Sequence, residues 1–304
     1  MIVLQSQLSK FNLIIHIFTP KIKYIIMKKI VWAISAVFLG ISVNAQVKMP
    51  AASPSEFIRQ EFGLGSIELS YSRPGLKGRK MIGVVEPWGS VWRTGANAAT
   101  RIRFTDIVEI DGKKLDTGSY ALYTIPEKNG EWYFILNKGI GNWGAGGYTK
   151  SDDVVRMKVK TGKNAQKVET LTMQFSDVKP ESIVLNIKWE DFSLRIPITT
   201  QIKDRIRASI EEAMKTNKKP YWQAANFFYE YDRDYKKALE MADAALAEQK
   251  NPPYYMIFYK ARIQKDMGDK KGALQTARQS LEGAKAARNE NYVIMSEQMI
   301  RELQ

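Results

Sequence analysis

The sequence has 304 residues, of which 44% are hydrophobic and 26% are charged, with a formal net charge of +14. This length and composition are typical of a globular protein with two domains and a sizeable core. Cysteine is absent and His16 is the only histidine, which excludes disulfides, thiol nucleophiles and zinc sites built on Cys or His.

Residues 1–45 have the features of a leader that contains a signal peptide. A basic start at 27–29 precedes an apolar run over 30–43, and small residues follow at 43–45. Signal peptides combine these three features in this order. We therefore predict translation from Met27 and cleavage after Ala45.

The alternative for this segment is an uncleaved membrane anchor over residues 11–43. Pro20, Lys21 and Lys23 interrupt that stretch, so we favour cleavage. Cleavage predicts a mature chain without a stable membrane anchor, exported to the periplasm or secreted from a Gram-negative-type bacterium. It also removes His16, and with it any histidine acid–base catalysis.

The excess of positive charge is smaller and evenly spread once the leader is removed. Five of the 46 basic residues lie in the leader, so 41 basic residues remain against 32 acidic ones, a net charge of +9. The mature chain has no basic tail or stripe. Because a nucleic-acid-binding protein usually has a concentrated basic surface, we expect no nucleic-acid partner.

Residues 46–200 predict an antiparallel β-sandwich of about eight strands. Apolar and polar residues alternate in several short runs, which is the pattern of half-buried strands. Turn sequences such as Asp111-Gly112 and Asn129-Gly130 separate the runs, and no helical periodicity lies between them. The alternating runs lie within residues 102–110, 132–136, 171–175, 183–189 and 192–198.

The hydrophobic period changes to a helical one near residue 200, where we place a domain boundary. Residues 201–215 predict one amphipathic helix and residues 291–303 predict the last. Between them the sequence matches itself at an offset of 35 residues, close to the period of tetratricopeptide repeats. The matched pairs are Phe228 with Ile263, Asp234 with Asp269, Ala238 with Ala273, Leu239 with Leu274, Ala242 with Ala277 and Leu246 with Leu281.

We therefore predict helical hairpin repeats over 201–304, and an α+β protein in two modules. The alternative is a helical bundle in which the alanines recur by chance.

Five motifs in the β region carry a family resemblance. They are Ser-Arg-Pro-Gly-Leu-Lys-Gly-Arg at 72–79, Trp-Arg-Thr-Gly-Ala-Asn at 92–97, Gly-Ser-Tyr-Ala-Leu at 118–122, a glycine-rich loop at 139–147 and Ser-Asp-Asp-Val-Val-Arg at 151–156. With these motifs, residues 55–200 resemble the exported bacterial family known as domain of unknown function 2911. Ala98 stands where the family pattern has Glu. The resemblance implies a fold and an export route, and it implies no activity.

The same loops supply a candidate ligand site. They combine aromatic, guanidinium, amide and carboxylate groups, which are suited to holding a glycan or another small polar ligand. A structural alternative for Arg93 is a guanidinium paired with Asp153 or with loop carbonyls. We expect the candidate residues to cluster in space: Trp92, Arg93, Asn97, Trp143, Asp153 and Arg156.

We assign no catalytic residue, metal or cofactor to this sequence. Asp152 and Asp153 are adjacent, so on a strand they face opposite sides and cannot act as an acid–base pair. The loop at 139–147 lacks the Lys-Ser/Thr ending of a phosphate-binding loop.

Three functions remain open. In the first, a non-enzymatic binding protein holds a glycan or small ligand in its β domain. In the second, the helical repeats dock a protein partner on a concave face that exposes Tyr254, Tyr255 or Tyr259, and no small-ligand site exists. The third is a carboxylate-dependent hydrolase of envelope glycan.

Overall fold

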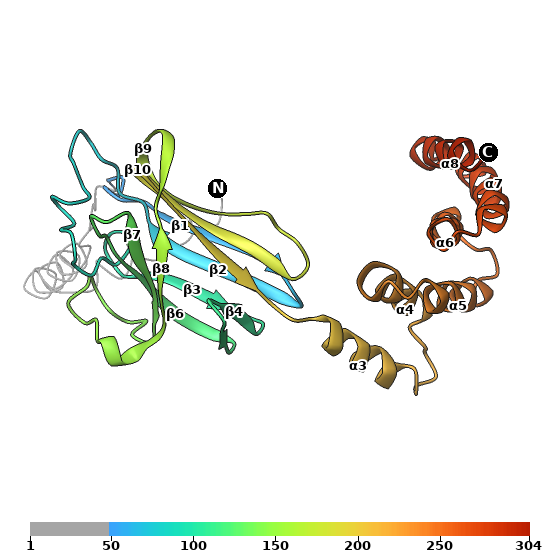
Figure 1. The fold of residues 1–304 in the computed structure, drawn as a ribbon, viewed down its shortest axis with the longest axis horizontal. Coiled ribbons are helices and arrows are strands. Elements are labelled where there is room, and N and C mark those ends of the chain that lie inside the picture. The colour runs from blue at the N-terminus through green and yellow to red at the C-terminus, as the bar shows by residue number, and fades with distance from the viewer. Residues whose placement is uncertain (1–48) are drawn as a thin grey trace, which may run out of the picture. The chain divides into compact units, whose positions relative to one another are not determined.

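The computed structural model describes residues 49–304, and Figure 1 shows a β region followed by a helical region. The predicted leader, with its start at Met27 and its cleavage after Ala45, lies outside the described residues. No helix within residues 49–304 is long and apolar enough to cross a membrane.

The β region has ten strands in two antiparallel sheets over the described residues. One sheet has the order β1-β2-β3-β6-β7-β8 and the other has the order β5-β4-β10-β9. The antiparallel β region is confirmed, with ten strands instead of about eight. The three-residue β5, Lys-Lys-Leu, is too short to show alternation. The strands are β1 (Ser55–Phe62), β2 (Gly65–Ser72), β3 (Thr100–Phe104), β4 (Val108–Ile110), β5 (Lys113–Leu115), β6 (Gly118–Ile125), β7 (Glu131–Asn137), β8 (Asp153–Lys160), β9 (Gly162–Ser176) and β10 (Ser182–Thr199).

The main core of the β region combines residues of both sheets. In β3, Ile102 and Phe104 are buried while Arg101 and Arg103 are exposed, as a period of two requires. The buried residues of this cluster all lie between Phe62 and Ile198. Full burial of each large apolar side chain stabilises the fold by about 1.5–3 kcal/mol.

The central strands of the six-stranded sheet are buried on both faces. In β6, the five residues from Ala121 to Ile125 are all buried, so both faces of this strand are covered. A strand with one face in solvent would instead alternate between buried and exposed residues. Ala121, Tyr123 and Ile135 form a second, smaller cluster on the face that points away from the main core. This second face has to be covered, and it positions the candidate site described below.

Six α-helices follow the sheets, which confirms the predicted helical region. The seven residues of α4 continue into a five-residue π-helical turn, η2. The helices are α3 (Lys203–Ala213), α4 (Tyr221–Phe227), α5 (Tyr235–Ala247), α6 (Tyr254–Asp266), α7 (Lys270–Ala286) and α8 (Glu290–Leu303), with η2 at Phe228–Asp232.

Residues related by the 35-residue offset occupy equivalent places in two helix pairs. Asp234 and Asp269 cap α5 and α7, because each side chain accepts a hydrogen bond from the backbone N–H three residues later, at 3.1 and 2.9 Å. Arg233 and Gly268 both precede these caps with a left-handed backbone, at φ 57° and 87°. The two turns are therefore built alike, although glycine adopts this backbone at less cost than arginine.

The buried clusters of the helical region include residues from Ile206 to Leu303 and share no member with those of the β region. Two hydrogen bonds link the start of α3 to the β region. Arg205 donates to Asp106 at 2.6 Å, and the backbone N–H of Ile202 donates to Glu181 at 3.1 Å.

We predict that residues 46–200, expressed alone, fold into a stable β domain. The main core lies wholly within this range, and without Arg205 the Asp106 carboxylate keeps its hydrogen bonds from the backbone N–H groups of Leu64 and Ile107. Circular dichroism should show strand-dominated structure and a cooperative melt. A molten or insoluble product would contradict independent folding.

Candidate functional site

The glycine-rich segment over residues 138–149 covers the outer face of β6. The side-chain amide of Asn142 donates to the hydroxyl of Tyr123 at 3.0 Å, and the ring of Tyr148 meets the ring of Tyr123 edge-on at 5.2 Å between centroids. Tyr123 is fully buried as a result. The segment therefore forms one side of the second cluster.

Asp153, the first residue of β8, ties this segment to the sheet. Its carboxylate accepts hydrogen bonds from Asn137 Nδ2 at 2.8 Å, from the Tyr148 hydroxyl at 2.8 Å and from Arg156 Nη1 at 3.1 Å. Burial, together with the hydrogen bond to Asp153, raises the pKa of Tyr148 to about 12. The side chain of Asp153 is only 6% exposed, so its hydrogen bonds are made with protein groups and not with solvent.

Arg156 completes this network. Its guanidinium donates to the Tyr148 hydroxyl at 2.9 Å and lies over the ring of Tyr133 at 4.8 Å from the centroid. The alternative in which Asp153 pairs with Arg93 is wrong, because Asp153 pairs with Arg156 three residues along its own strand.

Arg93, Asn97 and Trp143 lie around the other part of the glycine-rich segment. The backbones of Ala98 and Trp143 form an antiparallel bridge, and the N–H of Gly144 donates to the carbonyl of Asn97 at 3.2 Å. Trp143 is 75% exposed. Arg93 Nη1 lies beside Gly144, at 3.6 Å from where a β-carbon of that residue would stand.

Trp92 lies apart from this group. It is 2% exposed in the main core, where its ring stacks on Trp189 at 5.3 Å between centroids. Its indole N–H donates to the carbonyl of Gly95 at 3.2 Å. Because a ligand cannot reach this ring, we leave Trp92 out of the candidate site.

Sequence reasoning missed Glu86 and Tyr148. Burial raises the pKa of the Glu86 carboxyl, and the positive charge of Arg93 opposes that rise, so the two groups interact electrostatically. The position of Tyr148 directly after the glycine run was the one signal of its role, since an aromatic residue there can anchor a flexible loop.

Comparison with known families bears on this β region. Residues 53–198 match the family described as protein of unknown function DUF2911. This match confirms the predicted resemblance for the DUF2911 region, while the tetratricopeptide-like character of the helical region stays a prediction. No curated protein and no solved structure matches the chain.

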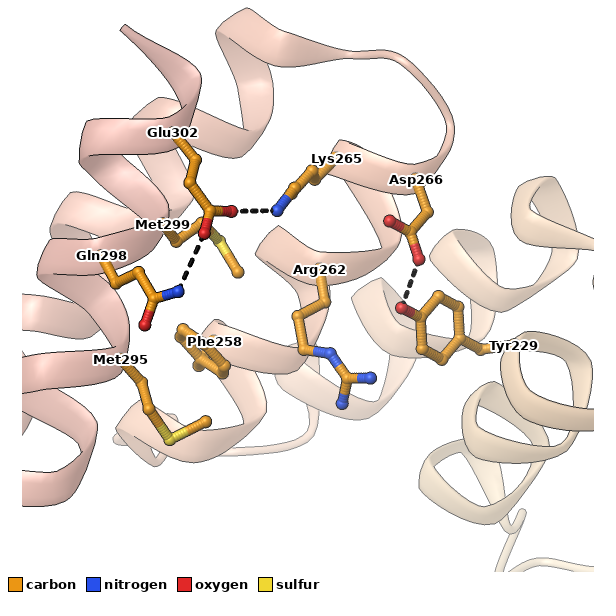
Figure 2. Close-up of a pocket in the computed structure, with 9 residues that line it drawn as sticks. All are labelled: Tyr229, Phe258, Arg262, Lys265, Asp266, Met295, Gln298, Met299 and Glu302. Atoms are coloured by element: carbon orange, nitrogen blue, oxygen red, sulfur yellow. Dashed lines mark hydrogen bonds and ion pairs between the residues drawn. The ribbon is translucent and has the colours of Figure 1, made fainter.

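A second candidate site lies in the helical region outside the DUF2911 match. A pocket of about 400 Å³ lies between η2, α6 and α8. Its lining residues are drawn in Figure 2. Phe258 and Met299 are buried at its apolar side, and Met295 is 42% exposed beside them. The lining residues are Tyr229, Phe258, Arg262, Lys265, Asp266, Met295, Gln298, Met299 and Glu302.

Charged and polar groups flank this apolar surface (Figure 2). The Tyr229 hydroxyl donates to Asp266 at 2.5 Å, and Lys265 pairs with Glu302 across from α6 to α8. The guanidinium of Arg262 lies over the ring of Tyr229 at 5.2 Å from the centroid. The polar groups are thus partly engaged with each other, and Met295 is the exposed one among these three apolar side chains.

The tyrosines expected on a concave helical face do not line this pocket. Tyr254 and Tyr259 are half-buried, and Tyr255 is exposed. The ring of Tyr259 packs against Trp222 at 5.0 Å between centroids. The pocket instead uses Phe258, Arg262 and Asp266, which are spaced four residues apart and lie on one face of α6.

We predict effects of very different size on stability for two residues of the β site. Asp153→Ala should lower the free energy of unfolding by about 3 kcal/mol, because the buried Asn137 and the half-buried Tyr148 and Arg156 lose their shared acceptor. Trp143→Ala should change it by about 0.5 kcal/mol or less, since the indole is exposed. Urea denaturation of both variants measures this, and an equally large loss for Trp143→Ala would mean that the indole supports the fold.

Proposed function

We propose that the protein is an exported, non-enzymatic binding protein whose helical region docks a partner protein. The observation that carries this proposal is the pocket between η2, α6 and α8, whose apolar side chains are flanked by the Lys265–Glu302 ion pair and the Tyr229–Asp266 hydrogen bond. Protein interfaces concentrate their binding energy where an apolar side chain fills such a pocket inside a polar rim. A volume of about 400 Å³ accommodates one large side chain of the partner.

The proposal includes an architecture in two domains. We take residues 46–200 as a β-sandwich, supported by one core shared between two sheets. We take residues 201–304 as tetratricopeptide-like repeats, supported by the equivalent caps at Asp234 and Asp269. Repeat arrays present an extended inner surface to their partners, and the pocket uses side chains from alternate elements of this array.

The proposed occupant is a segment of the partner that inserts one large apolar side chain between Phe258, Met295 and Met299. Lys265 and Glu302 pair with each other at the rim, so they need no charged group from the partner. An apolar anchor is therefore the feature that the pocket recognises.

We predict that Met295→Glu abolishes partner capture, because it places a charge beside the apolar surface of the pocket. Met267→Glu is the matched control: Met267 is 41% exposed, as Met295 is 42% exposed, and it does not line the pocket. Pull-down from envelope extract measures capture by the wild type and the two Glu variants. Photo-crosslinking locates the contact, with a benzoyl-phenylalanine at either position of an otherwise wild-type chain. Crosslinks should form at 295 and not at 267.

Equal crosslinking at positions 295 and 267 would contradict this proposal. So would a Met295→Glu variant that captures the same polypeptide as the wild type does.

Export is the other part of the proposal. It is supported by the basic, apolar and small residues in order over 27–45. Protein recovered from the periplasm or the medium should begin at Gln46 when sequenced from its N-terminus. An intact leader in the membrane fraction would instead indicate an anchor.

A further inference from the structure

We propose that the β region holds a second binding site, in which Arg93 takes the carboxylate of an acidic carbohydrate and Trp143 offers the sugar ring a stacking surface. This site shares no residue with the helical pocket, so it can be tested independently of partner docking.

The first step is that Arg93 has unused hydrogen-bonding capacity. A guanidinium carries five N–H donors. Nε of Arg93 is buried without an acceptor, and every arginine–carboxylate pair among residues 49–304 involves a different arginine. A ligand cannot reach the buried Nε, so the donors available to an anion are Nη1 and Nη2, for which residues 49–304 supply no hydrogen-bond acceptor.

Other half-buried arginines of the same domain show what a structural role looks like. Arg73 donates to the carbonyl of Leu171, to Thr172 and to Glu56, at 3.1, 3.1 and 3.3 Å. Arg156 donates to Asp153 and Tyr148. The guanidinium groups of Arg73 and Arg156 both donate hydrogen bonds to protein acceptors, whereas Nε of Arg93 has no acceptor.

The second step is the surface beside Arg93. Nη1 of Arg93 lies next to Gly144, whose left-handed φ of 75° disfavours any other residue there. Trp143 precedes Gly144 and is 75% exposed. Exposed indole faces stack on the apolar faces of sugar rings. Because Asp153 anchors the segment, the two groups are presented in a preorganised arrangement.

The third step is the charge of the ligand. A guanidinium binds a carboxylate or a phosphate through two parallel hydrogen bonds, so both anions share this chemistry. Trp143 favours an anion carried on a sugar ring over a free one. Glu86 interacts electrostatically with Arg93 and would compete with a bound anion, so its neutralisation should strengthen binding.

Isothermal titration calorimetry of the full chain tests this site with trigalacturonate, neutral maltotriose and inorganic phosphate. Trigalacturonate should bind at least about tenfold more tightly than either of the other two. Arg93→Gln and Trp143→Ala should each weaken its binding about tenfold or more, and Glu86→Gln should strengthen it several-fold. Arg59→Gln is the matched control, because it removes the same charge from an exposed arginine of β1 and should leave affinity unchanged.

Arg93→Lys keeps the positive charge but cannot form two parallel hydrogen bonds with a carboxylate. This variant replaces Arg93→Gln if Arg93→Gln shows an altered circular dichroism spectrum. It should also bind trigalacturonate more weakly. Failure of the wild type to bind trigalacturonate, or unchanged binding by the folded Arg93 variant, would overturn the proposal. Phosphate binding as tight as that of trigalacturonate would overturn the assignment to a carbohydrate.

Discussion

The hydrogen bonds accepted by Asp153 determine the geometry of the candidate β site. Asn137 at the end of β7, Tyr148 at the end of the glycine-rich segment and Arg156 within β8 all donate to this one carboxylate. Ordering a glycine-rich segment costs more conformational entropy than ordering other sequences. The network offsets that cost, and it keeps Trp143 exposed while Arg93 remains without an acceptor.

Stability and recognition are separated in the β region and overlap in the helical region. In the β region, Arg93 and Trp143 lie outside the main core. In the helical region, Phe258 and Met299 belong to a buried cluster and also line the pocket. In the helical region, Tyr229 and Glu302 line one pocket although 73 positions separate them in sequence. The pocket therefore depends on how successive helices pack, since no single helix could form it.

Periodicity could predict β3, β7 and β10, because each buries alternate residues in one core. It could not show that Trp92 points into the main core while Arg93 lies beside the glycine-rich segment. These directions follow from the pairing of Trp92 with Thr124. The partner of Asp153 was also beyond the sequence, because Arg93 and Arg156 are equally plausible by charge. On α6, the pocket face was missed because helix packing decides which residues point inward.

Hydrogen exchange of the full chain, measured by NMR at the amides of Gly139 and Gly144, tests the role of Asp153 most directly. These amides donate to Asn137 and Asn97 in the ordered segment. They should be protected in the wild type and should lose protection in Asp153→Ala, while the buried strand amide of Leu122 stays protected. Unchanged protection of both glycine amides in Asp153→Ala would contradict the account.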